Sequence, residues 1–330
     1  MNTKAPEVLS SIADALGGTP LVSLAGLELQ HLRAWAKLEQ FNPGGSAKDR
    51  TAHAMVAAAN IAPGTMVVES SSGNLGLALS REATLGRWDF HCVVDPRANA
   101  ATIAYMKAMG ATVHALTEPD PETGDWLVAR RKKVAELLAD NPAAINLDQY
   151  SNPAAFQAHC DGTMQEIHQQ LGQAPDYLLV AVSTTGTIGG CLRYIRENQL
   201  PTQVIAVDAE GSVLFDGTRG NRQLPGFGAG VVPELSRSVR PDRVMRVADR
   251  ASISAARRLA RSTAILPGAS GGAVIAALQQ LDGELTGDAT AAVVLHDGGN
   301  AYLQTIYDDH WVQETLGVVA LAEITTAAKG

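Results

Sequence analysis

The chain has 330 residues, of which 46% are hydrophobic and 18% are charged, and its formal net charge is −8. This balance is ordinary for a folded globular protein and argues against a disordered chain. The acidic excess argues against a nucleic-acid binder, which needs a basic face to displace counterions. One basic run, "RRKK" at 130–133, is short and lies in a helix-like segment, so we interpret it as a solvated helix face.

The three cysteines, Cys92, Cys160 and Cys191, stand far apart and form no CxxC pair. A metal cage and a disulfide framework are therefore both disfavoured, and free thiols in a reducing compartment are the simpler account. The N-terminal segment lacks the layout of a signal peptide, and no apolar run reaches membrane-spanning length. We expect a cytoplasmic protein with no bound metal, no nucleic-acid partner and no membrane contact.

The Ala-rich segment after Lys48 predicts a helix that begins where a Gly-Gly-Ser turn ends. Further along, short runs rich in Val and Ile alternate with helix-like segments. These runs are continuously apolar, which is typical of strands buried on both faces. The predicted strands are 66–70, 90–95, 111–116, 177–183, 203–209, 243–248 and 291–297. The predicted helices are 74–85, 100–109, 124–139, 153–171, 187–198, 251–262 and 271–281.

This alternation predicts an α/β fold with a mostly parallel sheet and right-handed crossovers. The first three strands form one closely spaced βαβαβ run. A break in the helical pattern, "NPAAINLDQYSNP" at 141–153, separates them from the next four strands. We take this break as the candidate crossing between two domains.

Three loops rich in small residues fall where open α/β sheets bind ligands, at the carboxyl ends of strands. The loop "STTGTIGG" (183–190) has four hydroxyls and three glycines and runs into a helix, which predicts a phosphate site. The loop "SSSGNLG" (70–76) either caps a helix through Ser72 or grips a carboxylate, with Asn74 bonding a ligand oxygen. In "PGASGGAVIAAL" (267–278), helix capping at Ser270 is the preferred interpretation from the loop alone.

Rival motifs are absent. The chain has no GxxxxGK[ST], so Lys48 is not a Walker lysine, and it has no HExxH and no GxSxG. The glycines of "GFGAG" (226–230) do not stand between a predicted strand and a predicted helix. A phosphate cradle without a nucleotide motif, together with a lysine at a loop end, indicates a cofactor with a small phosphate and an aldehyde. Pyridoxal phosphate is that cofactor.

Six sequence blocks resemble, in order, those of the cysteine synthase and cystathionine β-synthase family of fold-type II pyridoxal phosphate enzymes. The blocks are "GGTPLVSL" (17–24), "KLEQFNPGGSAKDR" (37–50), "SSSGNLGLALS" (70–80), "STTGTIGG", "GFGAGVVP" (226–233) and "GASGGAV" (268–274). The resemblance implies two open, mostly parallel sheets flanked by helices. It also implies a large cofactor-binding domain (1–44 and 151–330), a small mobile domain (45–150) that carries the substrate carboxylate loop, and a homodimer.

The same resemblance implies a role for each site residue. Lys48 would bind the cofactor covalently and transfer the substrate's α-proton. Asn74 would pair with the phenolic oxygen of the cofactor, and Ser270 would face its ring nitrogen. The phosphate cradle would comprise Ser183, Thr184, Thr185, Gly186 and Thr187. The substrate carboxylate would be held by Ser71, Ser72, Gly73 and Asn74.

Departures from the family pattern bear on the substrate. Cysteine synthases usually carry a GTGGT-type cradle where this chain has "STTGT", and "LHDGGNAYL" (295–303) replaces their proline-serine-glycine-rich segment. No haem-binding extension or regulatory module is expected, which disfavours a cystathionine β-synthase. The chain is more similar to the N-(2-amino-2-carboxyethyl)-L-glutamate synthases, notably in "NLDQYSN" (146–152) and "VDAEGSVLF…NRQLPGFGAGVVPEL" (207–235).

That subgroup implies a reaction of O-phospho-L-serine with L-glutamate, the first step towards 2,3-diaminopropionate for siderophores such as staphyloferrin B. Two alternatives stay open: a cysteine synthase that uses sulfide, and a non-catalytic scaffold of the same fold. Ser183 and Tyr150 are the residues we associate most with the subgroup chemistry, although Tyr150 is equally compatible with a packing role. Arg222 could meet a glutamate carboxylate or the departing phosphate, but a surface ion pair is the simpler interpretation.

Overall fold

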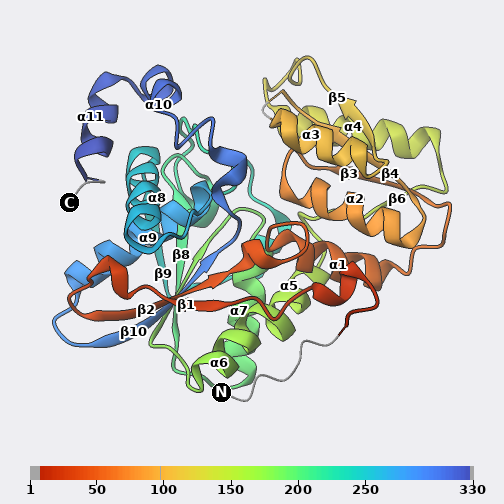
Figure 1. Cartoon of the computed structure of the whole chain (residues 1–330). Helices are drawn as coiled ribbons and strands as arrows, with labels where there is room; N and C mark the ends of the chain where they lie inside the picture. The colour runs from red at the N-terminus through yellow and green to blue at the C-terminus, as the bar shows by residue number, and fades with distance from the viewer. Residues whose placement is uncertain (1–7, 97, 328–330) are drawn as a thin grey trace.

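The computed structural model describes residues 8–96 and 98–327 and contains two separate β-sheets (Figure 1). The larger sheet has the strand order β1-β2-β10-β7-β8-β9, and the smaller has the order β5-β4-β3-β6. All neighbouring strands are parallel except β1, which is antiparallel to β2. Two open, mostly parallel sheets flanked by helices are therefore confirmed as the fold class.

The larger sheet is covered by helices on both faces. Helices α8 and α9 cover one face and α6 and α7 the other, so Leu179 and Val293 face one apolar core while Val180 and Ala292 face the second. Its strands are β1 (Leu21–Ser23), β2 (Leu32–Leu38), β7 (Tyr177–Ala181), β8 (Gln203–Ala209), β9 (Arg243–Val247) and β10 (Ala289–Leu295). Its helices are α6 (Gln165–Leu171), α7 (Gly186–Glu197), α8 (Asp249–Thr263) and α9 (Ala269–Glu284).

The smaller sheet lies beside it at the upper right of Figure 1. Leu79 and Met106 of α2 and α3 pack on one face, and Val134 of α4 packs on the other. Its strands are β3 (Met66–Ser70), β4 (Asp89–Val94), β5 (Thr112–Ala115) and β6 (Ile145–Asn146). Its helices are α2 (Asn74–Gly86), α3 (Ala100–Ala108) and α4 (Trp126–Asp140). The exact domain boundaries remain a prediction.

Helix α1 (Lys48–Ala59) begins at the lysine that the sequence singled out. The predicted helix 153–171 is confirmed as a continuous helical stretch, in which a π-helical turn, His159–Met164, joins α5 (Ala154–Ala158) to α6. The sequence also gave no sign of β1, β2, β6, α10 (Asp309–Leu316) or α11 (Val318–Ala327). No helix among the described residues is long and apolar enough to span a membrane.

Strand β2 was missed because Arg33 and Lys37 interrupt its apolar residues. Lys37 is nevertheless fully buried. Its ammonium donates to the Thr19 carbonyl at 2.7 Å and pairs with Glu166 at 2.6 Å. Long-range partners therefore make a charged position compatible with a core strand.

Candidate active site

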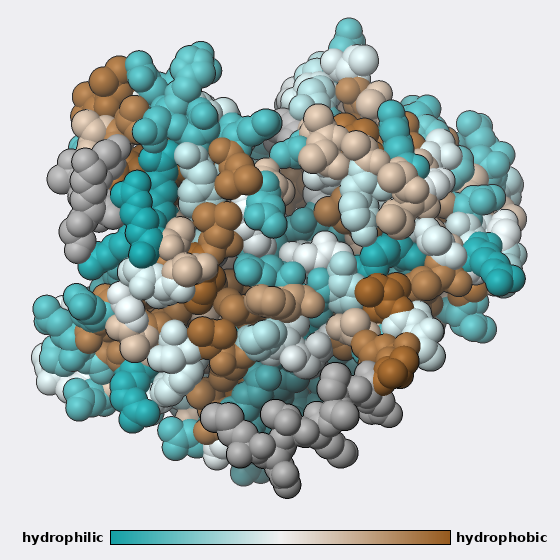
Figure 2. All heavy atoms as spheres, viewed as in Figure 1, coloured by the Kyte–Doolittle hydropathy of each residue, from teal (hydrophilic) through white to brown (hydrophobic). Residues whose placement is uncertain are grey.

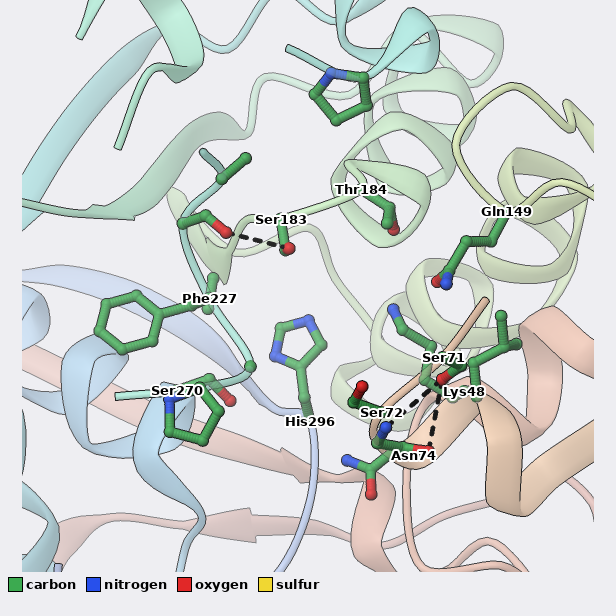
Figure 3. Close-up of a pocket in the computed structure, with 18 of the residues that line it drawn as sticks. Lys48, Ser71, Ser72, Asn74, Gln149, Ser183, Thr184, Phe227, Ser270 and His296 are labelled. Carbon is green, nitrogen blue, oxygen red and sulfur yellow. Dashed lines mark hydrogen bonds between the residues drawn. The ribbon is translucent and has the colours of Figure 1, made fainter. Parts of the chain in front are cut away.

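A cavity of about 520 Å³ lies where the two sheets meet, at the carboxyl ends of their strands. Elements of both sheets contribute side chains to it, and Figure 3 shows Lys48 and Asn74 on one side with Ser270 and Phe227 on the other. Every site residue proposed from the sequence lines this cavity: Lys48, Ser71, Ser72, Gly73, Asn74, Tyr150, Ser183, Thr184, Thr185, Gly186, Thr187, Arg222 and Ser270. The fold thus gathers all of them at one place, although their individual roles remain predictions.

Lys48 is held at the start of α1 by a short, tightly bonded turn. The carboxylate of Asp49 accepts the backbone N–H groups of Gly44 and Ser46, each at 3.2 Å, and pairs with the buried Arg81. The backbone N–H of Ala47 donates to the His296 carbonyl at 2.8 Å, which ties the turn to the end of β10. Burial lowers the pKa of Lys48, against a smaller opposing effect of Asp297. A lowered pKa makes the free amine more available for proton transfer.

The loop 183–187 begins at the end of β7 and places α7 with its N-terminus at the cavity. Thr185 is the residue before the helix and has a left-handed backbone, with φ +67°. Its buried hydroxyl has no hydrogen-bond partner among the described residues. Free N–H groups in the first turn of α7, beside this unpaired hydroxyl, suit a phosphate group.

His159, in the π-helical turn, supports this loop from behind. Its Nε2 lies 3.3 Å from the Thr187 hydroxyl and 3.1 Å from that of Thr51, while Nδ1 lies 2.9 Å from the Thr163 hydroxyl. Burial moves the pKa of His159 well below its usual value, so the ring is neutral. A neutral imidazole with bonded nitrogens fixes the position of Thr187.

The loop 71–74 joins β3 to α2 and presents its backbone to the cavity. The hydroxyl of Ser71 accepts the Gly76 N–H at 3.0 Å and thereby satisfies a backbone donor in the first turn of α2. The hydroxyl of Ser72 instead accepts the Asp95 N–H at 3.1 Å and a bond from Arg130 Nη1 at 3.2 Å. Helix capping by Ser72 is therefore wrong.

Asn74 and Ser270 stand at the starts of two helices, where their side chains reach the cavity (Figure 3). The Asn74 amide donates one bond to Asp297 Oδ2 at 2.8 Å, which leaves its second N–H available to a ligand. Ser270 is buried inside the first turn of α9, after Gly268 and Ala269, and makes no capping bond. The capping interpretation of Ser270 is wrong as well.

The cavity is also lined by polar residues that the sequence did not single out, among them Asp95, Arg130, His296 and Asp297. The solvated-face interpretation of "RRKK" is wrong for Arg130, which is buried with its Nε 3.2 Å from Asp95 Oδ2. A signal for the last two was present in "LHDGG", a polar departure from the family pattern at the end of a strand. Nothing local marks Arg130, because the next two residues of its basic run, Arg131 and Lys132, are exposed.

Tyr150 and Arg222 both line the cavity. Arg131 lies over the Tyr150 ring, 5.7 Å from its centroid, and burial raises the pKa of the Tyr150 hydroxyl. Arg222 is half-buried and donates to the Phe227 carbonyl at 3.3 Å. Both side chains combine a packing contact with access to the cavity, so neither is a plain surface residue.

The cavity fits pyridoxal phosphate on its own chemistry. It offers a lysine with a lowered pKa, a helix N-terminus with an unpaired buried hydroxyl for the phosphate, and neutral side chains for the ring. The lysine suits the aldehyde of the cofactor, the helix N-terminus suits its phosphate dianion, and the neutral side chains suit its pyridine ring.

Comparisons with known proteins agree with this chemistry. Residues 12–297 match the family model described as "Pyridoxal-phosphate dependent enzyme". The chain is 39% identical over 310 residues to N-(2-amino-2-carboxyethyl)-L-glutamate synthase of Ralstonia nicotianae, covering 92% of this chain and 91% of the relative.

Two solved structures illustrate the likeness in fold. The O-acetylserine dependent cystathionine beta-synthase of Helicobacter pylori is similar with a TM-score of 0.84 at 27% identity, over 92% of this chain and 100% of that one. O-ureido-L-serine synthase is similar with a TM-score of 0.81 at 28% identity, over 93% and 99% of the two chains. By family model, sequence and fold alike, this chain belongs to the pyridoxal-phosphate dependent enzymes.

Proposed function

We propose that the enzyme catalyses a β-replacement in which the α-amine of L-glutamate displaces phosphate from O-phospho-L-serine. The products are N-(2-amino-2-carboxyethyl)-L-glutamate and phosphate. The relative from Ralstonia nicotianae, which bears the name of this activity, supports the proposal. The observation in the structure that supports it most is the buried Arg130 on the cavity wall.

Arg130 brings a guanidinium to the cavity wall, where its Nε is paired with Asp95. Its guanidinium extends from α4 to the carboxylate loop and hydrogen-bonds the Ser72 hydroxyl. A guanidinium binds phosphate with two parallel bonds, and burial makes such charge-assisted bonds stronger. Acetate leaves with one charge and fewer acceptor oxygens, so Arg130 favours O-phosphoserine over O-acetylserine.

The bound cofactor withdraws electrons from the α-carbon of the amino acid and so acidifies its proton. Lys48 accepts this proton and later returns it, because its amine has a lowered pKa. The N–H groups and hydroxyls of the loop 71–74 hold the substrate carboxylate. Ser270 offers a neutral hydroxyl to the ring nitrogen, which favours loss of the β-substituent over transamination.

The size of the cavity and the residue Arg222 bear on the binding of the second amino acid, glutamate. The cavity of about 520 Å³ lies within the range of small-molecule sites. Arg222 also lines the cavity, and we propose that its guanidinium meets the side-chain carboxylate of glutamate. Sulfide would need neither the room nor the cation.

The test is phosphate release from O-phosphoserine by the holoenzyme, with and without glutamate, followed by product mass. We expect release that depends on glutamate and a product with the mass of the glutamate adduct. Formation of cysteine from O-acetylserine and sulfide at a higher rate would instead establish the cysteine synthase alternative. Absence of turnover with either pair would leave the non-catalytic scaffold.

A variant pair tests the part assigned to Arg130. Arg130→Gln should lower kcat/KM for O-phosphoserine by about 10- to 100-fold, the effect of one lost bond to a charged group, and should affect O-acetylserine much less. Lys133→Gln, at a partly exposed residue of the same helix that does not line the cavity, is the control and should leave both rates unchanged. Equal losses for both substrates would contradict the assignment.

We further propose that the product is used in siderophore assembly, that the enzyme works in the cytoplasm, and that it is a homodimer.

Exposed apolar side chains near the N-terminus support the dimer: Leu9, Ile12, Val22 and Phe41. Figure 2 shows apolar residues gathered on the face that carries β1. A second copy covering this face would remove them from water. Sedimentation at micromolar concentration tests it, and a mass of one chain would refute it.

A further inference from the structure

His296 is a cavity residue to which neither the sequence nor the proposed reaction assigns a part. It follows the last residue of β10, and its backbone carbonyl accepts the N–H of Ala47, beside Lys48. The position of its Cα relative to Lys48 is therefore fixed by backbone bonds. Figure 3 shows its imidazole pointing into the middle of the cavity, between Ser270 and Lys48.

The ring of His296 has two polar atoms without partners. Both Nδ1 and Nε2 are buried, and neither makes a hydrogen bond with any residue that the structure describes. The Val294 carbonyl approaches the ring without meeting the geometry of a hydrogen bond. Two unpaired buried nitrogens cost stability, since each has lost its bonds to water. This loss of stability is explained if a bound ligand forms a hydrogen bond with one of the nitrogens.

The charge state of the ring narrows what that partner is. Burial and the nearby Lys48 lower the pKa of His296 to about 3, so the imidazole is neutral at physiological pH. The other titratable neighbour, His159, is neutral as well. A neutral imidazole offers one N–H donor and one lone pair. It therefore suits the polar atoms of an uncharged aromatic ring better than a carboxylate or a phosphate.

We propose that His296 binds the cofactor directly, through a hydrogen bond between a nitrogen of its neutral imidazole and a polar atom of the pyridoxal ring. The loop 183–187 would supply the donors for the phosphate end of the cofactor, whereas Ser270 and Asn74 would hold its ring end. His296 is placed between these two side chains and completes the set around the ring.

The experiment measures cofactor binding to the apoenzyme in the absence of any amino acid. His296→Phe keeps an aromatic ring of similar size and removes both nitrogens. It should raise the dissociation constant of pyridoxal phosphate about 3- to 10-fold, the effect of one neutral hydrogen bond. His296→Gln restores a donor and an acceptor and should bind within about twofold of the wild type. His310→Phe, a change at an exposed histidine of α10, is the matched control and should have no effect.

Thermal unfolding of the apo forms separates binding from a structural role. Removal of two unpaired buried nitrogens should leave apo His296→Phe at least as stable as the apo wild type, while the stabilisation on adding cofactor becomes smaller. An unchanged dissociation constant for His296→Phe would overturn the proposal. So would a loss of apo stability, because it would show that the imidazole holds the fold together. Neither measurement involves O-phosphoserine or glutamate, so its outcome does not depend on the proposed reaction.

Discussion

Thr185 combines two unfavourable features that a single substitution can remove. Its β-branched side chain occupies a left-handed backbone position with φ +67°, and its buried hydroxyl has no partner in the described part of the chain. Such a backbone conformation costs about 1–3 kcal/mol, and an unpaired buried hydroxyl costs a similar amount. We expect these costs to be retained because the hydroxyl donates a hydrogen bond to the cofactor phosphate.

Thr185→Gly should therefore stabilise the apoenzyme and weaken cofactor binding. The substitution removes the backbone strain and the unpaired hydroxyl, which stabilises the folded state. It also loses the buried methyl group and adds entropy to the unfolded chain, so the net gain in the free energy of unfolding is about 1 kcal/mol. For a chain of this size the gain raises Tm by about 1–2 °C. Loss of one hydrogen bond to a charged group, worth about 1.5–3 kcal/mol, should raise the dissociation constant of pyridoxal phosphate by roughly 10- to 150-fold.

Calorimetry of the apo forms and titration with cofactor measure the two effects separately. Thr185→Ala is the matched variant, because it removes the hydroxyl and keeps a Cβ in the strained position. It should bind cofactor as weakly as Thr185→Gly but be less stable as the apoenzyme. An apo Thr185→Gly that is less stable than the wild type, or one that binds cofactor as tightly, would refute the reasoning.

Three other predictions concern different parts of the site. Lys48→Ala should abolish turnover yet fold normally, because it removes the proton-transfer group while losing little packing; a borohydride-reducible cofactor linkage in this variant would contradict the assignment. The Ser183 hydroxyl donates to the Gly228 carbonyl at 3.1 Å, and we expect it to turn to the leaving group when substrate binds. Ser183→Gly should therefore narrow the preference for O-phosphoserine over O-acetylserine by about tenfold or more, and stopped-flow spectra with both substrates would reveal it. Burial raises the pKa of Glu69 to about 8 from 4.5, so the folded state keeps a proton that the unfolded state loses. Stability should thus fall as pH rises from about 5 to 8, and Glu69→Gln should flatten this slope in urea unfolding; parallel slopes for both proteins would argue against a protonated Glu69.

Apart from the short strand β6, the sequence alone determined the alternation of strands and helices from β3 to β10 and the loops that surround the cavity. It could do so because strands buried on both faces are recognised from continuous apolar runs, and ligand loops from glycine and hydroxyl content. These signals lie within a few neighbouring residues. Lys48 and the loops 71–74 and 183–187 were found in this way, without any knowledge of what lies across the cavity.

Only the tertiary structure decided which charged and polar residues are buried. Lys37 lies in a core strand because Glu166 and Thr19 satisfy its charge, and Arg130 turns inward because Asp95 and Ser72 meet it there. His296 was included in a predicted strand, whereas β10 ends at Leu295 and antiparallel bridges from Ser46 and Pro267 take over at residues 297 and 298. For Lys37 and Arg130 the burial of a charged group depends on partners from distant segments, and a local pattern contains no record of those partners.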